Sequence, residues 1–134
     1  MNNRRALLLT LGFIILLLSA CAGSPTTEKN ELRIRTEQDA HRATTSLLAK
    51  ADTQEKAKHW EQAAALLERA LRIDPRNAHL WHRLAAVRFQ QGQYRLAESL
   101  AQKSNALAPD DVELQQENLR LMDEARSFTR EAPL

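Results

Sequence analysis

The stretch AHLWHRLAAVRFQQGQYRLAESLAQKSNALAPDD, residues 78–111, contains the pattern that decides the fold. Gly92 separates two runs of apolar and small residues, and Pro109 closes the second run. Within each run these residues recur every three or four positions, which places them on one side of a helix. They are Trp81, Leu84, Ala85 and Val87 in the first run, and Tyr94, Ala97, Leu100, Ala101 and Ser104 in the second. The stretch predicts a hairpin of two short amphipathic helices, whose apolar sides need neighbouring helices to cover them.

The composition of the chain favours helices and one small domain. Aromatic residues make up 4% of the 134 residues and there are three glycines, which disfavours a β-sandwich or a glycine-built nucleotide fold. Ala, Leu, Gln, Glu and Arg are abundant, and these residues are good helix formers. We therefore expect an all-α fold with room for one domain and short appendages.

The distribution of charge argues against a nucleic-acid partner. The formal net charge is +2, with 19 Lys and Arg against 17 Asp and Glu. Residues 1–20 hold Arg4 and Arg5 and no acid, so the remaining chain has 17 basic and 17 acidic residues. Binding of phosphates needs a surplus of basic residues on one face. Residues 78–109 are locally basic and residues 110–134 are acidic, and we expect these surfaces to compensate each other.

The N-terminus resembles a bacterial lipoprotein signal. It combines a basic start, a short apolar run and small residues before a cysteine. The lipobox of that family is matched by Leu18, Ser19, Ala20 and Cys21. The resemblance implies that residues 1–20 are a signal peptide and that Cys21, the sole cysteine, becomes the lipidated first residue of the mature chain. An uncleaved anchor or an ordinary secreted protein is the alternative.

Lipidation at Cys21 would attach the protein to a membrane, because several acyl chains bind far more strongly than one. Ala22 and Gly23 follow the cysteine where inner-membrane lipoproteins of this family commonly have Asp. The family's sorting rule therefore implies the outer membrane, and we expect its periplasmic side. Residues 21–35 include Pro25 and show no helical stripe, so we predict a flexible tether there.

Helical patterns begin at Thr36, which with Asp39 resembles a capping box. Pro75 ends a later helix, because the residue before a proline avoids the α region, and Asn77 is placed to cap the next one. A last apolar stripe lies in residues 112–128. It consists of Leu114, Asn118, Leu119, Met122 and Ala125.

Matched residues recur at an offset of 34. The pairs are Leu47 and Trp81, Ala51 and Ala85, Trp60 and Tyr94, Ala63 and Ala97, and Pro75 and Pro109. Thirty-four is the period of the tetratricopeptide repeat, a helix-turn-helix unit that residues 78–111 resemble closely. The resemblance is carried by Trp81, Leu84, Ala85, Gly92, Tyr94, Ala97 and Pro109. It implies a fragment of a right-handed α-solenoid over residues 36–128. The expected parts are units at 44–77 and 78–111, a capping helix at 111–128 and a tail at 129–134.

The first unit departs from the repeat motif at two positions. Lys50 replaces a signature leucine, and Lys58 replaces the turn glycine, which adopts a left-handed conformation more cheaply than lysine does. These departures leave open whether the first helix of this unit packs in register. Two units and a cap form a small core, with which a homodimer is compatible.

No arrangement of residues predicts catalysis or a cofactor. The chain lacks the Gly-x-Ser-x-Gly, phosphate-loop, Cys-x-x-Cys and His-Glu-x-x-His motifs. His79 and His82 have the i, i+3 spacing of metal ligands, but a third ligand is missing from the pattern. We interpret them as solvated side chains and expect no metal site, no cofactor and no enzymatic activity.

The tetratricopeptide resemblance implies a protein-binding groove along the first helices of the units. By position its residues are Leu48, Asp52 and Glu55, then His79, His82, Ala86 and Phe89, and finally Gln116 and Arg120 in the cap. Phe89 is either an exposed anchor for a peptide or part of the hairpin core. The leading hypothesis is an outer-membrane lipoprotein that binds a protein or peptide partner of the cell envelope as an adaptor. The alternative is a structural or self-associating spacer subunit of an envelope or pilus-assembly complex.

Overall fold

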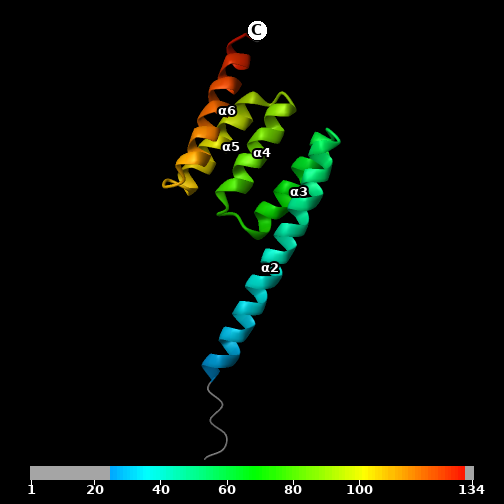
Figure 1. The fold of residues 1–134 in the computed structure, drawn as a ribbon, viewed down its shortest axis with the longest axis vertical. Helices are drawn as coiled ribbons and strands as arrows, with labels where there is room; N and C mark the ends of the chain where they lie inside the picture. The colour runs from blue at the N-terminus through cyan, green and yellow to red at the C-terminus, as the bar shows by residue number, and fades with distance from the viewer. Residues whose placement is uncertain (1–24, 132–134) are drawn as a thin grey trace, which may run out of the picture. The chain divides into compact units, whose positions relative to one another are not determined.

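The computed structural model describes residues 25–131, so the expected signal peptide, Cys21 and residues 132–134 lie outside the described range. Within it the chain forms five helices, α2 (Pro25–Lys56), α3 (Trp60–Ile73), α4 (Ala78–Gln90), α5 (Tyr94–Leu107) and α6 (Val112–Glu131) (Figure 1). No strand occurs in this range, and the predicted all-α class is confirmed. None of the described helices combines the length and the hydropathy that crossing a membrane requires.

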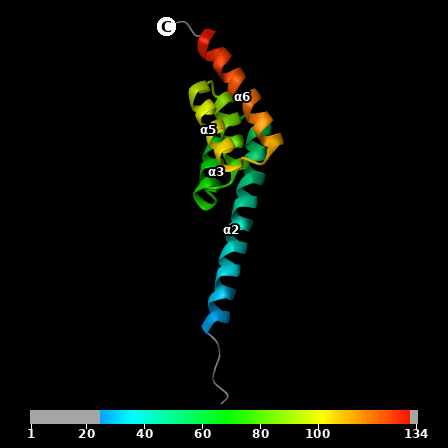
Figure 2. The same cartoon turned by 90° about the vertical axis from the view of Figure 1, so that its left-hand side faces the viewer.

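The chain divides into two compact units after Glu37. The described part of the N-terminal unit is the beginning of α2, and the rest of α2 forms the repeat unit together with α3 to α6. In the repeat unit α4 packs against α3 and α5, and α6 packs against α5 (Figures 1 and 2). The predicted order of two helical hairpins followed by a capping helix is confirmed, and α6 continues three residues beyond its expected end at residue 128.

The two hairpin turns have the same backbone hydrogen bonds. Lys58 N donates to Glu55 O at 2.9 Å, and Gly92 N donates to Phe89 O at 2.9 Å. The bonds that follow are His59 N to Gln54 O at 2.8 Å and Gln93 N to Arg88 O at 2.9 Å. Each of these atoms lies 34 residues from its counterpart, so the first unit has the same register as the second.

Helix starts repeat at the same interval. Asn77 Oδ1 accepts a bond from Leu80 N at 3.2 Å, which is the cap that the sequence predicts for α4. Asp111 Oδ1 accepts the equivalent bond from Leu114 N at 3.0 Å. The cap helix therefore begins as the first helix of a third unit would begin.

Lys58 adopts the left-handed conformation that Gly92 has in the second unit. The φ angle of Lys58 is 57° and that of Gly92 is 74°. The left-handed conformation costs a residue with a side chain about 1–2 kcal/mol. Replacement by glycine removes this cost, but glycine also makes the unfolded chain more flexible, which cancels part of the stabilisation. We expect Lys58→Gly to raise the free energy of unfolding by about 0.5–1 kcal/mol, measured by urea denaturation.

The matched control is Lys50→Gly in the exposed interior of α2. There the same change should lower the free energy of unfolding by about 1 kcal/mol, because glycine is a poor helix former. A loss of stability in both variants would show that the Lys58 turn is not strained.

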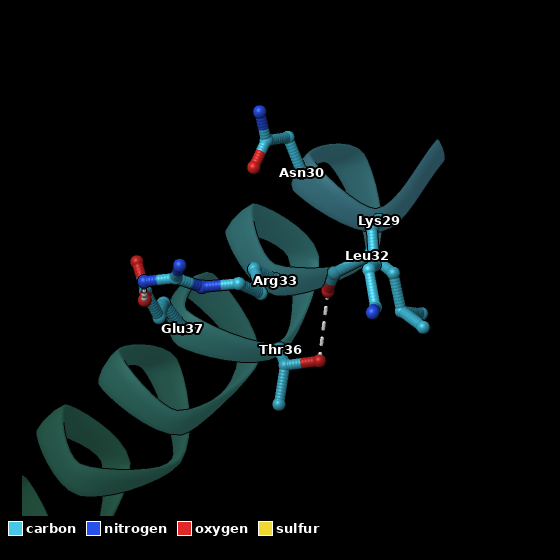
Figure 3. A pocket seen from close by; sticks show the side chains of 6 residues that line it. All are labelled: Lys29, Asn30, Leu32, Arg33, Thr36 and Glu37. Atoms are coloured by element: carbon cyan, nitrogen blue, oxygen red, sulfur yellow. Dashed lines mark hydrogen bonds and ion pairs between the residues drawn. The ribbon is translucent and has the colours of Figure 1, made fainter. Parts of the chain in front are cut away.

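The prediction of a flexible tether over residues 21–35 is wrong from Pro25 onward, where α2 begins. Thr36 is not a helix cap. Its Oγ1 donates to Leu32 O at 2.8 Å, one turn earlier in the same helix (Figure 3). Residues 26–37 contain no glycine or proline, and proline is tolerated in a first helical turn. The side chains of residues 29 to 39 are all exposed. A helix without a buried side needs no apolar stripe, so this segment has no amphipathic pattern.

Two apolar clusters form the core of the repeat unit. The first joins α2, α3 and α4 around Leu67, which is 0% exposed. The second joins α4, α5 and α6 through Ala85, Ala101 and Met122. The small alanines let the helices approach closely, but they bury little apolar area. Hydrogen bonds add to the packing of this second cluster. One of them joins α5 to α4, where Ser104 Oγ donates to Ala78 O at 2.9 Å.

Candidate partner-binding surfaces

The nine predicted groove residues occupy equivalent positions on α2, α4 and α6. Leu48, His82 and Gln116 are 34 residues apart, and the same interval separates the other members of the set except His79, which has no counterpart in it. On each helix they are spaced by three, four or seven residues, which puts them on one side of that helix. We call this side of α2, α4 and α6 the A-face. The remaining members are Asp52, Ala86 and Arg120, then Glu55 and Phe89, and His79.

Between α2 and α4 the A-face is tied together by an ion-pair network. Arg83 of α4 donates to Asp52 and, at 2.7 Å, to Glu55 Oε1 of α2. The side chain of Glu55 is half-buried, whereas that of Asp52 is exposed to solvent. Both predicted acids therefore join the first unit to the second and are partly neutralised before any partner arrives.

Between α4 and α6 the A-face contains a polar network around Asn118, whose side chain is 0% exposed. His82 Nδ1 donates to Asn118 Oδ1 at 2.8 Å. Asn118 Nδ2 donates to Ser104 Oγ at 2.9 Å and to Asn105 Oδ1 at 2.8 Å. Because the Ser104 hydroxyl already donates to Ala78 O, it accepts from Asn118, and this order of donors fixes the orientation of the amide. His82 is thus a structural residue that holds the cap.

His79 and His82 do not converge on a common ligand position. His79 is 70% exposed in its side chain, and its Nε2 lies 3.5 Å from Asp111 Oδ2. His82 Nε2 lies 3.6 Å from Glu117 Oε2. Within residues 25–131 no three His, Cys, Asp or Glu side chains gather as metal ligands would. Each histidine instead lies near an acid of the cap region. The paired arginines of the basic segment, Arg83 and Arg88, contact acids of α2 and α3 rather than acids of residues 110–134.

Phe89 packs into an aromatic cluster that joins α4, α5 and the cap. Its ring centroid lies 5.2 Å from that of Tyr94 and 5.7 Å from that of Phe128, in edge-on geometry. Tyr94 and Phe128 stack on each other at 4.8 Å. Of the two interpretations of Phe89, the structure therefore shows the packed one. Phe128 was missed because it lies at the very end of the expected cap helix, three residues after the last residue of the predicted stripe, Ala125.

The cap is also held by an ion pair to α5. Glu98 Oε1 accepts from Arg126 Nε at 2.7 Å, and this hydrogen bond with the nearby negative charge raises the pKa of the Arg126 guanidinium. Arg126 Nη1 donates to Asp123 Oδ1 of its own helix at 3.3 Å. The α6 helix is therefore fastened in its middle by Asn118 and near its end by Arg126.

One part of the A-face is hollowed. A depression of about 480 Å³ lies where α2, α3 and α4 meet near the first hairpin turn. It is lined by Glu55, Lys56, Lys58, Trp60, Ala86, Val87 and Gln90. Of the nine predicted residues, Glu55 and Ala86 line this depression. Exposed polar side chains continue along the face, namely Asp52, His79, Gln116 and Arg120.

A second groove, which the sequence does not predict, lies between α3 and α5 over α4. Its volume is about 570 Å³, and we call it the B-groove. It is lined by Glu68, Leu71, Arg72, Pro75, Trp81, Leu84, Arg88, Leu96 and Leu100. Trp81 is half-buried in its wall and donates from Nε1 to Pro75 O at 2.9 Å. No pattern along one helix reveals this groove, because three helices contribute to it.

The hollow along α2 in Figure 3 has a different character. Its side chains all come from a single exposed helix. They are Lys29, Asn30, Leu32, Arg33, Thr36 and Glu37. One helix cannot enclose a ligand, and the closest charged contact, between Arg33 and Glu37 at 3.6 Å, is an ordinary exposed pair one turn apart. This hollow is a solvated helix surface.

Comparisons with known proteins agree with the repeat geometry. The sequence pattern of the tetratricopeptide repeat matches residues 54–120, half of the chain. The chain is also similar to the solved globular C-terminal domain of P. aeruginosa LpoP, at 34% identity and a TM-score of 0.63. This similarity covers 66% of the chain and 84% of the LpoP domain. The comparison with curated proteins found no match. Because the family pattern matches half of the chain and the two hairpin turns repeat the same backbone hydrogen bonds, the chain belongs to the tetratricopeptide repeat family.

Proposed function

We propose that the protein is a lipid-anchored adaptor of the bacterial cell envelope, which binds a segment of another envelope protein on its A-face. Membership of the tetratricopeptide family and the similarity to the C-terminal domain of LpoP support a role in protein interaction. The lipobox ending at Cys21 supports attachment to the outer membrane, on its periplasmic side. The nine predicted residues then divide into those that build the face and those that meet the partner.

The observation that carries the proposal is the depression at the first hairpin turn. Its volume of about 480 Å³ lies in the range of pockets that accept a side chain or a small ligand. Its lining combines the small Ala86 with the apolar side chains of Trp60 and Val87. Lys56 and Lys58 line it from the end of α2 and the turn. A partner segment with an apolar side chain next to an acidic one fits this lining.

Contact with the partner would fall to the residues that stay accessible on this face. Asp52, His79, Gln116 and Arg120 are exposed, and Glu55 and Ala86 line the depression. Leu48, His82 and Phe89 have structural roles, because Leu48 packs against the first core cluster and the other two hold the cap. Substitution of these three would alter the fold together with any binding.

Site-specific photocrosslinking in intact envelopes tests this proposal. Gln90 is exposed and lines the depression, so a photoreactive amino acid at this position should form an adduct with one envelope protein. Gln102, an exposed glutamine on α5 that lines neither groove, is the matched control and should give none. Adducts that are absent at both positions, or equal at both, would refute binding on the A-face.

A self-associating spacer is the second candidate, and one feature of the cap favours it. Leu119 occupies the position of Ala51 and Ala85, which are 0% exposed beneath the second helices of their units. Because α6 is the last described helix, Leu119 is 51% exposed and Val112 is 64% exposed. A second copy of the chain could cover them. Light scattering of the purified protein decides the matter, since a monomer at every concentration removes this candidate.

A further inference from the structure

We propose that the B-groove is a second docking site, which takes an acidic amphipathic segment of a partner protein. Its floor is apolar and recessed, because Leu71 is 7% exposed and Leu84 is 4% exposed. Leu96, at 43% exposed, and the half-buried Leu100 form the α5 side. Trp81 is held in the wall by its bond to Pro75 O. The side chains of the groove are thus arranged before a partner binds, which lowers the cost of binding.

The charge of the B-groove selects an acidic partner. Glu68 and Arg88 line the groove and neutralise each other in an ion pair. Arg72 lines it as well, and among the described residues no carboxylate lies at ion-pair distance from it. Lys103, exposed and three residues after Leu100, lies on the same side of α5. One unpaired guanidinium on α3 and one ammonium on α5 therefore flank an apolar floor.

A polypeptide segment fits this shape better than a membrane surface does. The apolar residues of the B-groove lie in a trough between three helices, and the most deeply buried of them form its floor. A bilayer contact needs apolar side chains that protrude beyond the polar ones. An amphipathic helix instead places its apolar side in such a trough and keeps its charged side next to the rims. Leucine or phenylalanine on one side and glutamate on the other is the chemistry that matches.

The proposal does not depend on binding at the A-face. The B-groove is lined by α3, α4 and α5 and shares no residue with the A-face depression. The two tryptophans of the chain report on the two sites separately. Trp81 lines the B-groove and Trp60 lines the A-face depression. Trp60→Phe therefore leaves a reporter at the B-groove only, and Trp81→Phe leaves one at the depression only.

Fluorescence titration of the full-length protein tests the proposal. The probe is a synthetic amphipathic peptide with leucines on one side and glutamates on the other. Two control peptides replace the glutamates with lysine or the leucines with serine. In the Trp60→Phe background we expect the acidic peptide to change Trp81 emission and to bind at least about tenfold more tightly than either control. Phospholipid vesicles with anionic headgroups provide a parallel titration.

Two substitutions locate the binding. Arg72→Glu should weaken the acidic peptide at least about tenfold by reversing the charge at the rim. Arg120→Glu, the same exchange at an exposed position on the A-face, should leave the affinity unchanged. Circular dichroism confirms that each variant is folded. The proposal is overturned if the three peptides bind equally or not at all, or if Arg120→Glu has the larger effect. It is also overturned if the acidic peptide changes Trp60 emission in the Trp81→Phe background but not Trp81 emission in the Trp60→Phe background, or if anionic vesicles alone change Trp81 emission.

Discussion

Replacing Asn118 with alanine is expected to lower the free energy of unfolding by about 3 kcal/mol. Asn118 is fully buried and bonds to His82, Ser104 and Asn105. Its loss leaves the buried Ser104 hydroxyl and the partly buried His82 and Asn105 side chains without their partner, and each buried polar group left unpaired costs about 1–3 kcal/mol. A change of this size is a large fraction of the stability of a small domain.

The Asn118 prediction can be measured by guanidinium unfolding and by the thermal midpoint. We expect a fall in Tm of at least about 10 °C. Gln116→Ala is the control, because Gln116 lies two residues away on the exposed side of the same helix. It should change the free energy of unfolding by no more than about 0.5 kcal/mol. Equal stability of the two variants would mean that the polar network does not hold the cap.

Replacing Cys21 with serine is expected to release the protein from the membrane. Cys21 is the sole cysteine and lies outside the described residues, so this prediction rests on the lipobox that it ends. A serine hydroxyl cannot form the thioether through which lipoproteins carry their diacylglycerol. Each buried methylene of an acyl chain contributes about 0.8 kcal/mol, so its loss removes most of the membrane affinity.

Fractionation of envelopes measures the effect of Cys21→Ser, and mass spectrometry of the mature N-terminus checks its cause. The wild type should be found in the outer-membrane fraction with a lipidated Cys21 as its first residue. Ser24→Ala, three residues further on, is the control and should behave as the wild type. A Cys21→Ser protein that stays in the membrane fraction, or a mature chain that begins elsewhere, would contradict lipid anchoring.

The repeat is the part of this fold that sequence predicts best. Pairs such as Ala63 and Ala97 recur at one offset, and the structure repeats the backbone bonds at the same offset. Even Lys58, a departure from the motif, adopts the conformation of its glycine counterpart, because burial of the first helix outweighs the local strain. The helix from Pro25 to residue 35 was missed because a polar helix has no apolar periodicity to detect.

The candidate sites were predicted less completely, for reasons that lie in side-chain pairing. Spacing puts His82 and Phe89 on the A-face of α4, and it predicts a solvated His82, whose side chain is only 22% exposed. It does not show that Asn118 bonds to one and that Phe128 packs against the other. An asparagine in an otherwise apolar stripe was the available signal for a buried network. The B-groove had no such signal, because its walls come from segments up to 32 residues apart, from Glu68 to Leu100.

The most direct test of partner binding on the A-face is the affinity of the lipidated protein for the protein captured at position 90. Titration calorimetry would compare the wild type with Ala86→Arg, which fills the depression, and Ala106→Arg, the same change at an exposed position on α5. Binding on the A-face predicts that Ala86→Arg raises the Kd at least about tenfold and that Ala106→Arg leaves it unchanged. Equal affinities for all three proteins would contradict it.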